Sequence, residues 1–208
     1  MKYDINYKLY LVTEEDMPFE QLLPVIKQAV SGGVSLVQLR EKSSEGRIFY
    51  KKALELKSFL DTLSIPLIIN DRVDVALAVG AAGVHVGQSD LPLEAVKKII
   101  PDSMVVGISA RTVEEAVLAE EKGADYIGVG SIFPTLSKPD AKLLPKRMLE
   151  KIIESVTIPV VAIGGITEQN AGMLQEYKID GLAVISSITR ADDPKSAAER
   201  LLKNAFRG

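Results

Sequence analysis

Short apolar runs alternate with amphipathic segments along almost the whole chain, and this alternation limits the fold more than any other feature. The runs are continuously apolar, which is typical of strands whose two faces are both covered. Between them, apolar residues recur at helical spacing, as at Leu22, Ile26 and Ala29. Strict alternation of strands and helices predicts a parallel sheet. We predict strands at 9–12, 34–39, 66–69, 83–86, 104–109, 126–129, 159–163 and 181–185.

The number of strand–helix units favours a closed barrel over an open sheet. Helices are predicted at 19–30, 47–63, 73–79, 93–100, 113–122, 148–155, 167–176 and 194–206, which gives eight units in 208 residues. This count matches a small (β/α)8 TIM barrel, whereas the alternative, a doubly wound open sheet, would usually have fewer strands for this length. No linker or low-complexity tract divides the chain, so we expect an α/β protein with a single TIM-barrel domain over residues 1–208.

The composition excludes several classes of protein. The chain has no cysteine, so it has neither a disulfide framework nor a thiolate metal site, and its single histidine rules out a His-rich metal site. The net charge is −3, tryptophan is absent and aromatic residues make up 5%, which argues against a nucleic-acid surface. The sequence shows no signal peptide and no apolar run of membrane-spanning length. We therefore expect a cytoplasmic protein that acts on small molecules, without nucleic-acid or membrane partners; whether it forms a homo-oligomer is open.

Two aspartates follow neighbouring predicted strands. Asp71 comes directly after the strand at 66–69 and Asp90 comes shortly after the strand at 83–86. Parallel strands joined by a crossover helix lie close together and run the same way, so both carboxylates should reach one rim of the sheet. Mg²⁺ prefers one or two carboxylates together with substrate phosphate oxygens. The pair therefore indicates a magnesium site, with helix N-caps as the alternative.

Cationic and polar side chains follow the second predicted strand. Because side chains alternate along an extended chain, Gln38, Arg40 and Lys42 should point the same way. An amide and two cations in one mouth form an anion site, and arginine can bind a phosphate through two hydrogen bonds. The alternative is that the cations pair with neighbouring surface glutamates such as Glu41. Ser109, at the end of the fifth strand, either donates to a phosphate or caps the next helix.

A second, neutral anion site is expected after strands seven and eight. These strands end in Gly164-Gly165 and in Ser186-Ser187, and the loops after strands seven and eight are the usual phosphate site of a TIM barrel. Glycine lets the backbone approach an anion closely. The preceding loop, 130–146, contains Lys138 and three hydroxyl side chains that can also wrap a phosphate. The alternatives are an ordinary mobile loop here and two tight strand-to-helix turns after strands seven and eight. His85 and Tyr10 are expected to be buried packing residues rather than catalytic groups.

Seven short motifs span nearly the whole chain. They are Q-L-R-E-K at 38–42, I-N-D-R at 69–72, H-V-G-Q-S-D-L-P at 85–92, G-I-S-A at 107–110, G-S-I-F-P-T-L-S-K at 130–138, A-I-G-G-I at 162–166 and V-I-S-S-I at 184–188. In these motifs and their order, the chain resembles the thiamine phosphate synthase family, also called the thiamin-phosphate pyrophosphorylases. Any one motif alone would be weak, but the set is specific.

The resemblance implies a Mg²⁺-dependent transferase of thiamine biosynthesis. Such an enzyme joins 4-amino-2-methyl-5-hydroxymethylpyrimidine diphosphate to a thiazole phosphate and releases pyrophosphate. The resemblance implies that Gln38, Leu39, Arg40, Glu41, Lys42, Asn70, Ser109 and Lys138 hold the pyrimidine diphosphate, with Arg40, Lys42, Ser109 and Lys138 taking part in catalysis. It also implies that Thr135, Leu136, Ser137, Gly165, Ile185 and Ser186 hold the thiazole phosphate, and that Asp71 and Asp90 bind Mg²⁺.

Three positions depart from the pattern of the family. Ser131 stands where the family often has proline, Ser137 where it often has threonine, and Arg111 where many relatives have histidine. The related thiazole tautomerases use a histidine near the last position for proton transfer, so Arg111 argues against that alternative activity. A further alternative is a protein that binds thiamine precursors without turnover, which would have no need of a complete set of metal and diphosphate ligands.

Overall fold

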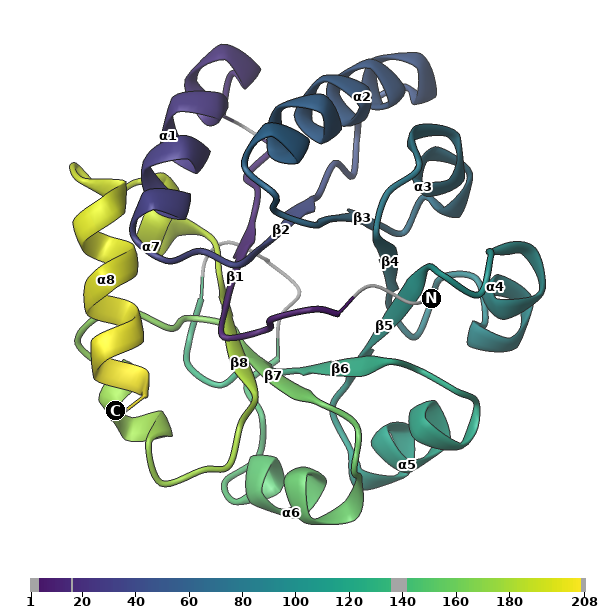
Figure 1. Ribbon diagram of the computed structural model, residues 1–208. Helices are drawn as coiled ribbons and strands as arrows, with labels where there is room; N and C mark the ends of the chain where they lie inside the picture. Colours follow the sequence, from purple (N-terminus) through teal and green to yellow (C-terminus); the bar gives the residue numbers. More distant parts are fainter. Residues whose placement is uncertain (1–3, 16, 136–141, 207–208) are drawn as a thin grey trace.

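The computed structural model describes residues 4–15, 17–135 and 142–206, and in these the chain forms a closed barrel of eight parallel strands surrounded by helices (Figure 1). The strands are β1 (Leu9–Val12), β2 (Leu36–Leu39), β3 (Leu67–Asn70), β4 (Gly83–Val86), β5 (Val105–Ala110), β6 (Tyr126–Val129), β7 (Val160–Ile163) and β8 (Gly181–Val184). They are hydrogen-bonded in sequence order, and β8 pairs with β1. The predicted (β/α)8 TIM barrel is confirmed, and the open sheet is wrong.

Seven of the eight predicted helices follow the strands as the periodicity predicts. The helices in the described residues are α1 (Phe19–Ser31), α2 (Gly46–Thr62), α3 (Val73–Val79), α4 (Leu93–Ile99), α5 (Val113–Glu121), α6 (Met148–Ser155), α7 (Ser186–Thr189) and α8 (Pro194–Ala205), with a 3₁₀-helix η1 (Ala171–Leu174). Local signals set several ends: the Thr112 side chain caps α5 by accepting a hydrogen bond from the Glu115 N–H, and Gly80 ends α3 in the left-handed conformation. No helix in the described ranges is both long and apolar enough to cross a membrane.

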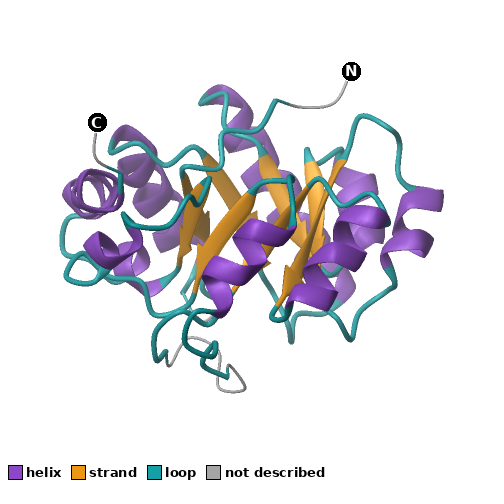
Figure 2. Ribbon diagram, turned by 90° about the horizontal axis from the view of Figure 1, so that it is seen from below, coloured by secondary structure: helices purple, strands orange, loops and turns teal. Residues whose placement is uncertain are grey.

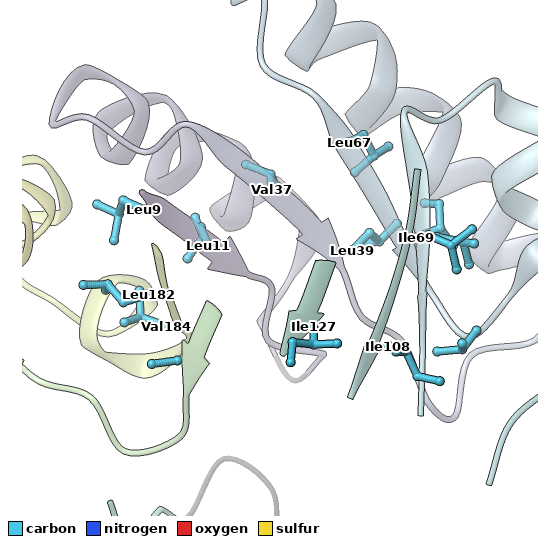
Figure 3. Packing of buried hydrophobic residues seen from close by; sticks show 14 of the residues in the cluster. Leu9, Leu11, Val37, Leu39, Leu67, Ile69, Ile108, Ile127, Leu182 and Val184 are labelled. Atoms are coloured by element: carbon cyan, nitrogen blue, oxygen red, sulfur yellow. The ribbon is translucent and has the colours of Figure 1, made fainter. Parts of the chain in front are cut away.

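Two separate sets of apolar side chains pack on the two faces of the strands. One parity of each strand faces outward and packs under the helices, as Leu9 and Leu11 do from β1 and Val37 and Leu39 from β2 (Figure 3). The other parity fills the inside of the barrel, where Tyr10, Val12, Leu36, Ile68, Val105, Tyr126, Val161 and Ala183 form a smaller cluster. Both faces are therefore buried, which explains why the strands read as continuous apolar runs.

The first and last helices lie side by side where the barrel closes. Figure 1 shows α8 (yellow) next to α1 (purple), and residue Leu9 of β1 stands opposite Leu182 of β8 in the sheet. Gly32, at the end of α1, allows this approach, since a Cβ atom there would lie 2.3 Å from the Lys195 carbonyl oxygen of α8.

The helix predicted at 167–176 is wrong, because only η1 forms there. The Asn170 side chain accepts a hydrogen bond from the Thr167 N–H at 2.8 Å and donates one to the Gly165 carbonyl oxygen at 2.8 Å. Asparagine that binds nearby backbone in this way competes with helix formation, and Gly172 weakens the helix further. The short helix α7, directly after β8, was not predicted from the sequence.

Candidate active site

The carboxyl ends of all eight strands open at one end of the barrel, the lower end in Figure 2, and the predicted site residues that the structure describes lie there. A cavity of about 240 Å³ enters the barrel at this end. Its wall includes Gln38, Arg40, Asn70 and Ser109, four of the residues predicted for the pyrimidine diphosphate. Leu136, Ser137 and Lys138 lie outside the described residues.

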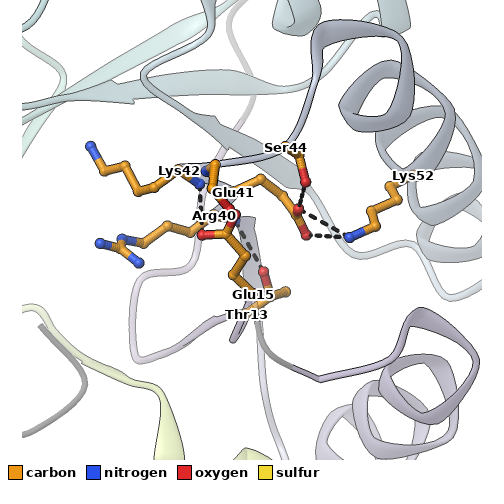
Figure 4. A network of polar contacts seen from close by, with 8 residues as sticks. Thr13, Glu15, Arg40, Glu41, Lys42, Ser44 and Lys52 are labelled. Carbon is orange, nitrogen blue, oxygen red and sulfur yellow. Dashed lines mark hydrogen bonds and ion pairs between the residues drawn. The ribbon is translucent and has the colours of Figure 1, made fainter.

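The segment after β2 is held in place by residues of the loop after β1. The Thr13 hydroxyl accepts a hydrogen bond from the Arg40 N–H at 3.0 Å, and the Glu15 carboxylate accepts bonds from the N–H groups of Lys42 and Ser43 at 2.9 and 2.7 Å (Figure 4). Burial opposes ionisation of Glu15, but these bonds, the Ser43 hydroxyl and the nearby Arg40 charge lower its pKa to about 2. Glu15 thus stays ionised and fixes the backbone that carries the two cations.

The side chains of this segment alternate as predicted. Glu41 turns away from Arg40 and Lys42, and its carboxylate binds the Lys52 ammonium of α2 at 2.9 Å and the Ser44 hydroxyl (Figure 4). Leu39 packs outward among the apolar residues under the helices. Glu41 and Leu39 therefore present only their backbone to the mouth. The alternative, that the cations pair with neighbouring glutamates, is wrong for Lys42, whose ammonium binds the Asp71 carboxylate instead.

The two predicted metal ligands lie close together. The pKa of Asp71 is raised above its ordinary value. Burial is the largest cause and the nearby Asp90 carboxylate adds to it, whereas the Lys42 ammonium acts in the opposite direction. One Asp90 oxygen accepts a hydrogen bond from the Gly87 N–H at 2.8 Å. Neither aspartate caps a helix, since the N-cap residues of α3 and α4 are Arg72 and Pro92, without side-chain capping bonds. The alternative that these carboxylates serve as helix N-caps is therefore wrong.

The carboxylate pair is not a complete cage for a metal ion. In the ranges that the structure describes, no three His, Cys, Asp or Glu side chains converge as they would around an ion held by the protein alone. Two carboxylates that repel each other suit a hard cation whose remaining ligands are water and substrate oxygens.

A chain of buried polar side chains crosses the inside of the barrel. The Gln38 amide donates to the Tyr10 hydroxyl at 2.7 Å, Tyr10 and Tyr126 bond at 3.0 Å, and Tyr126 bonds to His85 Nδ1 at 3.0 Å. His85 Nε2 lies 3.0 Å from the Ser109 hydroxyl oxygen. Tyr10 and His85 are buried, as expected, but they also line the cavity together with Tyr126, which the sequence analysis missed. Tyr126 and Gly128 lie two positions apart on β6, so they face the same side of the strand. This alternation was the feature of the sequence that could have placed Tyr126 in the cavity.

Two buried nitrogen atoms in the cavity residues have no hydrogen-bond acceptor. They are Asn70 Nδ2 and Arg111 Nε, the only buried side-chain polar atoms without a partner in residues 4–15, 17–135 and 142–206. The Arg111 guanidinium donates elsewhere to the Lys142 carbonyl oxygen at 3.1 Å. Buried donors are rarely left unsatisfied, so these two atoms suit acceptors on a bound ligand.

A second cavity, of about 590 Å³, adjoins the first. Gly165, Ile185, Ser186 and Thr135 contribute to its wall, as expected for the phosphate site after β7 and β8. Arg40 lines both cavities, as do Thr135 and Ile185. The two cavities therefore meet along a shared wall, and ligands in them would be neighbours.

Two glycines, Gly164 and Gly165, form part of the wall of the second cavity. Gly165 has φ +64°, and a Cβ atom there would lie 2.3 Å from the Pro134 carbonyl oxygen. The loop after β6 is fixed to the same segment, since the N–H groups of Ile132 and Phe133 donate to the carbonyl oxygens of Ile163 and Gly164 at 3.0 Å. Only glycine permits both the conformation and the close approach at position 165.

Comparison with known proteins now assigns the chain to a family. A family model described as thiamine monophosphate synthase matches residues 9–188. The chain belongs to the thiamine monophosphate synthase family. It is 52% identical over 204 residues to the thiamine-phosphate synthase of Ruminiclostridium cellulolyticum, covering 98% of this chain and 97% of that protein. It is 49% identical over 200 residues to that of Methanobrevibacter smithii, with 96% of each chain covered.

A solved structure supports the same assignment. The thiamine phosphate pyrophosphorylase of Pyrococcus furiosus superposes with a TM-score of 0.86 at 40% sequence identity, and 96% of each chain is covered. The resemblance drawn from the motifs is thus confirmed, and the chain is a transferase of the thiamine monophosphate synthase family.

Proposed function

We propose that this protein is a thiamine-phosphate synthase that joins 4-amino-2-methyl-5-hydroxymethylpyrimidine diphosphate to a thiazole phosphate and releases pyrophosphate. The observation that carries the proposal is the meeting of two unlike anion sites at one barrel mouth. The first is lined by Arg40 and Asn70, with Asp71 of the carboxylate pair directly after Asn70. The second has glycine backbone and hydroxyl groups in its wall beside Arg40 and an Arg190–Glu14 ion pair, so the expected neutral site is wrong in charge. Its relatives are named for this reaction.

The first cavity suits the pyrimidine diphosphate. Arg40 lines this cavity, and Lys42 binds the Asp71 carboxylate nearby. The Asn70 amide nitrogen has no acceptor in the described residues and can donate to a phosphate oxygen. Lys138, expected to join this set, lies outside the described residues. The polar chain from Gln38 to Ser109 lies deeper in the cavity and would hold the uncharged pyrimidine ring.

Asp71 and Asp90 would hold Mg²⁺ at the edge of this cavity. The donor set fits this ion, because burial and a neighbouring carboxylate both disfavour the ionised form of Asp71, and a divalent cation would offset that repulsion. Bound there together with diphosphate oxygens, the ion would supply charge neutralisation of the leaving group. Lys42, which binds Asp71, would then be released toward the diphosphate.

The second cavity suits the monophosphate of the thiazole. Its wall offers backbone N–H groups around Gly165, the hydroxyl groups of Ser186 and Thr135, and the Arg40 guanidinium as donor types for a phosphate. Because the shared wall places the two ligands side by side, the thiazole nitrogen can approach the pyrimidine methylene carbon. The carbon–oxygen bond to the diphosphate breaks with its electron pair on the departing oxygen, and the nitrogen lone pair forms the new carbon–nitrogen bond.

The test is pyrophosphate release with both substrates, with and without Mg²⁺. We expect release that requires Mg²⁺, the thiazole phosphate and an intact Asp71. Asp71→Ala should abolish it, whereas Asp61→Ala, which removes an exposed carboxylate paired with Lys57 on α2, should leave it unchanged. Wild-type protein that binds both substrates without releasing pyrophosphate would refute the proposal.

Neither alternative activity is favoured. Arg111 occupies the position at which a tautomerase would need histidine, and the single histidine is engaged by Tyr126 and Ser109. An isomerisation assay on thiazole carboxylates without the pyrimidine diphosphate separates the reactions, because a tautomerase needs no second substrate.

A further inference from the structure

The first hydrogen bond of the polar chain inside the barrel, between Gln38 and Tyr10, can run in only one direction. The Gln38 amide nitrogen faces the Tyr10 hydroxyl oxygen at 2.7 Å, and an amide nitrogen can only donate. The Tyr10 oxygen therefore accepts this bond, and its own hydrogen is left for its other neighbour. That neighbour is the Tyr126 hydroxyl oxygen at 3.0 Å.

The same reasoning carries the direction to the histidine. Tyr126 accepts from Tyr10, so its hydrogen goes to His85 Nδ1 at 3.0 Å. In neutral imidazole one ring nitrogen accepts and the other carries the hydrogen. Since Nδ1 accepts, Nε2 carries the hydrogen and donates to the Ser109 oxygen at 3.0 Å.

The tyrosines cannot interrupt this direction by ionising. Both are fully buried, and burial raises the pKa of Tyr10 and of Tyr126 well above the ordinary tyrosine value. Each tyrosine hydroxyl therefore keeps its hydrogen, accepts one hydrogen bond and donates one. Four bonds in a row, contributed by five strands (β1, β2, β4, β5 and β6), then point one way.

The direction determines what Ser109 offers a ligand. The Ser109 oxygen accepts from His85, and no other described group forms a hydrogen bond with its hydroxyl. Its side chain lines the cavity, so the remaining hydrogen is available there. We propose that Gln38, acting through Tyr10, Tyr126 and His85 as positioning residues, makes Ser109 a hydrogen-bond donor to an acceptor atom of the pyrimidine diphosphate. The identity of the ligand rests on the proposed function, whereas the direction of the hydrogen bonds does not depend on it.

Reversing the donor and acceptor in the bond between position 38 and Tyr10 would reverse the other three hydrogen bonds as well. A side chain that can only accept, placed at position 38, would take the Tyr10 hydrogen. Tyr10 would then accept from Tyr126, Tyr126 from His85 Nδ1–H, and His85 Nε2 from the Ser109 hydroxyl. Ser109 would present lone pairs to the cavity instead of a hydrogen. The ionised form of Gln38→Glu makes this change with almost no change in shape, and alkaline pH keeps the new carboxyl group ionised during the measurement.

Nitrogen NMR of the histidine tests the direction in the substrate-free protein. The chain has one histidine, so labelling with ¹⁵N-histidine gives one imidazole to assign. We expect the hydrogen on Nε2 in the wild type and on Nδ1 in Gln38→Glu. Gln28→Glu, the same change at an exposed position of α1, should keep it on Nε2.

Three results would overturn the proposal. They are a wild-type hydrogen on Nδ1, a doubly protonated ring at neutral pH, and a folded Gln38→Glu protein whose hydrogen stays on Nε2. If Gln38→Glu does not fold, Tyr10→Phe cuts the chain between Gln38 and the histidine. The proposal then requires a mixture of tautomers, and a hydrogen that remains wholly on Nε2 contradicts it.

Kinetics test the consequence for Ser109. Ser109→Ala should lower kcat/KM about 10-fold in the wild-type background, the worth of one hydrogen bond. In the Gln38→Glu background, where Ser109 no longer donates, the same change should have almost no effect. Equal effects in both backgrounds would refute the role of Gln38. Absence of turnover in the wild type would instead refute the proposed function and leave the NMR result standing.

Discussion

The two cavities at the barrel mouth would hold anions by different means. The first is lined by Arg40 and Asn70, and Asp71, directly after Asn70, belongs to a carboxylate pair whose repulsion is only partly relieved by Lys42. The second has glycine backbone and hydroxyl groups around Gly165 and Ser186, and Arg190 in its wall is already paired with Glu14. The difference suits the fates of the two phosphates in the proposed reaction. A diphosphate that departs gains charge and benefits from cations, whereas a monophosphate that only anchors its substrate needs position alone.

Neutralising one carboxylate should break the first cavity with the largest effect. Asp90→Asn keeps an oxygen that can accept from the Gly87 N–H but removes the charge. We expect turnover to fall about 100-fold and the Mg²⁺ requirement to rise, because a metal ligand is lost. Asp61→Asn on α2 is the matched control, and an unchanged Mg²⁺ dependence in Asp90→Asn would remove Asp90 from the metal site.

A methyl group at Gly165 should disturb the second cavity selectively. Gly165→Ala forces a side chain into a position with φ +64° and 2.3 Å from the Pro134 carbonyl oxygen. We expect the KM for the thiazole phosphate to rise at least about 10-fold, with little change for the pyrimidine diphosphate. Gly80→Ala has the same strain, φ +63°, but meets nothing within 4 Å, so it separates backbone strain from the lost phosphate site. Equal rises in both KM values for Gly165→Ala would contradict the separation of the two cavities.

Removal of one hydroxyl should sharpen the comparison. Ser186→Ala removes a donor from the wall of the second cavity, and the KM for the thiazole phosphate should rise about 10-fold or less, as for one hydrogen bond. Ser187→Ala is the neighbouring control, since it removes a hydroxyl at the next position, one that donates to the Ile166 carbonyl oxygen at 2.5 Å. Steady-state kinetics with each substrate varied in turn distinguish the two. A rise confined to the pyrimidine diphosphate would place Ser186 in the wrong cavity.

The smallest effect concerns stability rather than turnover. Because the folded state raises the pKa of Asp71, its ionisation favours unfolding, and this cost is absent below the unfolded pKa and complete above the folded one. Asp71→Asn without Mg²⁺ should therefore raise Tm by a few degrees at pH 7 and have little effect at acidic pH. Thermal melts across this range check it, and a lower Tm at pH 7 would mean that the ion pair with Lys42 outweighs the repulsion.

Sequence reasoning located most of the groups in these cavities because their positions follow from local rules. Alternation along an extended chain put Arg40 and Lys42 on one side and Glu41 on the other. The same rim was expected for Asp71 and Asp90 because neighbouring parallel strands end together. The failure at 167–176 is also local, since Asn170 binds backbone that a helix would need, and periodicity does not register that competition.

The sequence by itself determined the eight strands and seven of the eight predicted helices, because a continuous apolar run and a helical repeat each depend on a few neighbouring residues. Only the tertiary structure decided which polar side chains meet inside the barrel. Tyr10 and Tyr126 lie 116 positions apart, and their hydroxyl groups reach 3.0 Å only because β1 and β6 face each other across a closed barrel. Closure also turns His85 from an isolated buried side chain into the link between those tyrosines and Ser109.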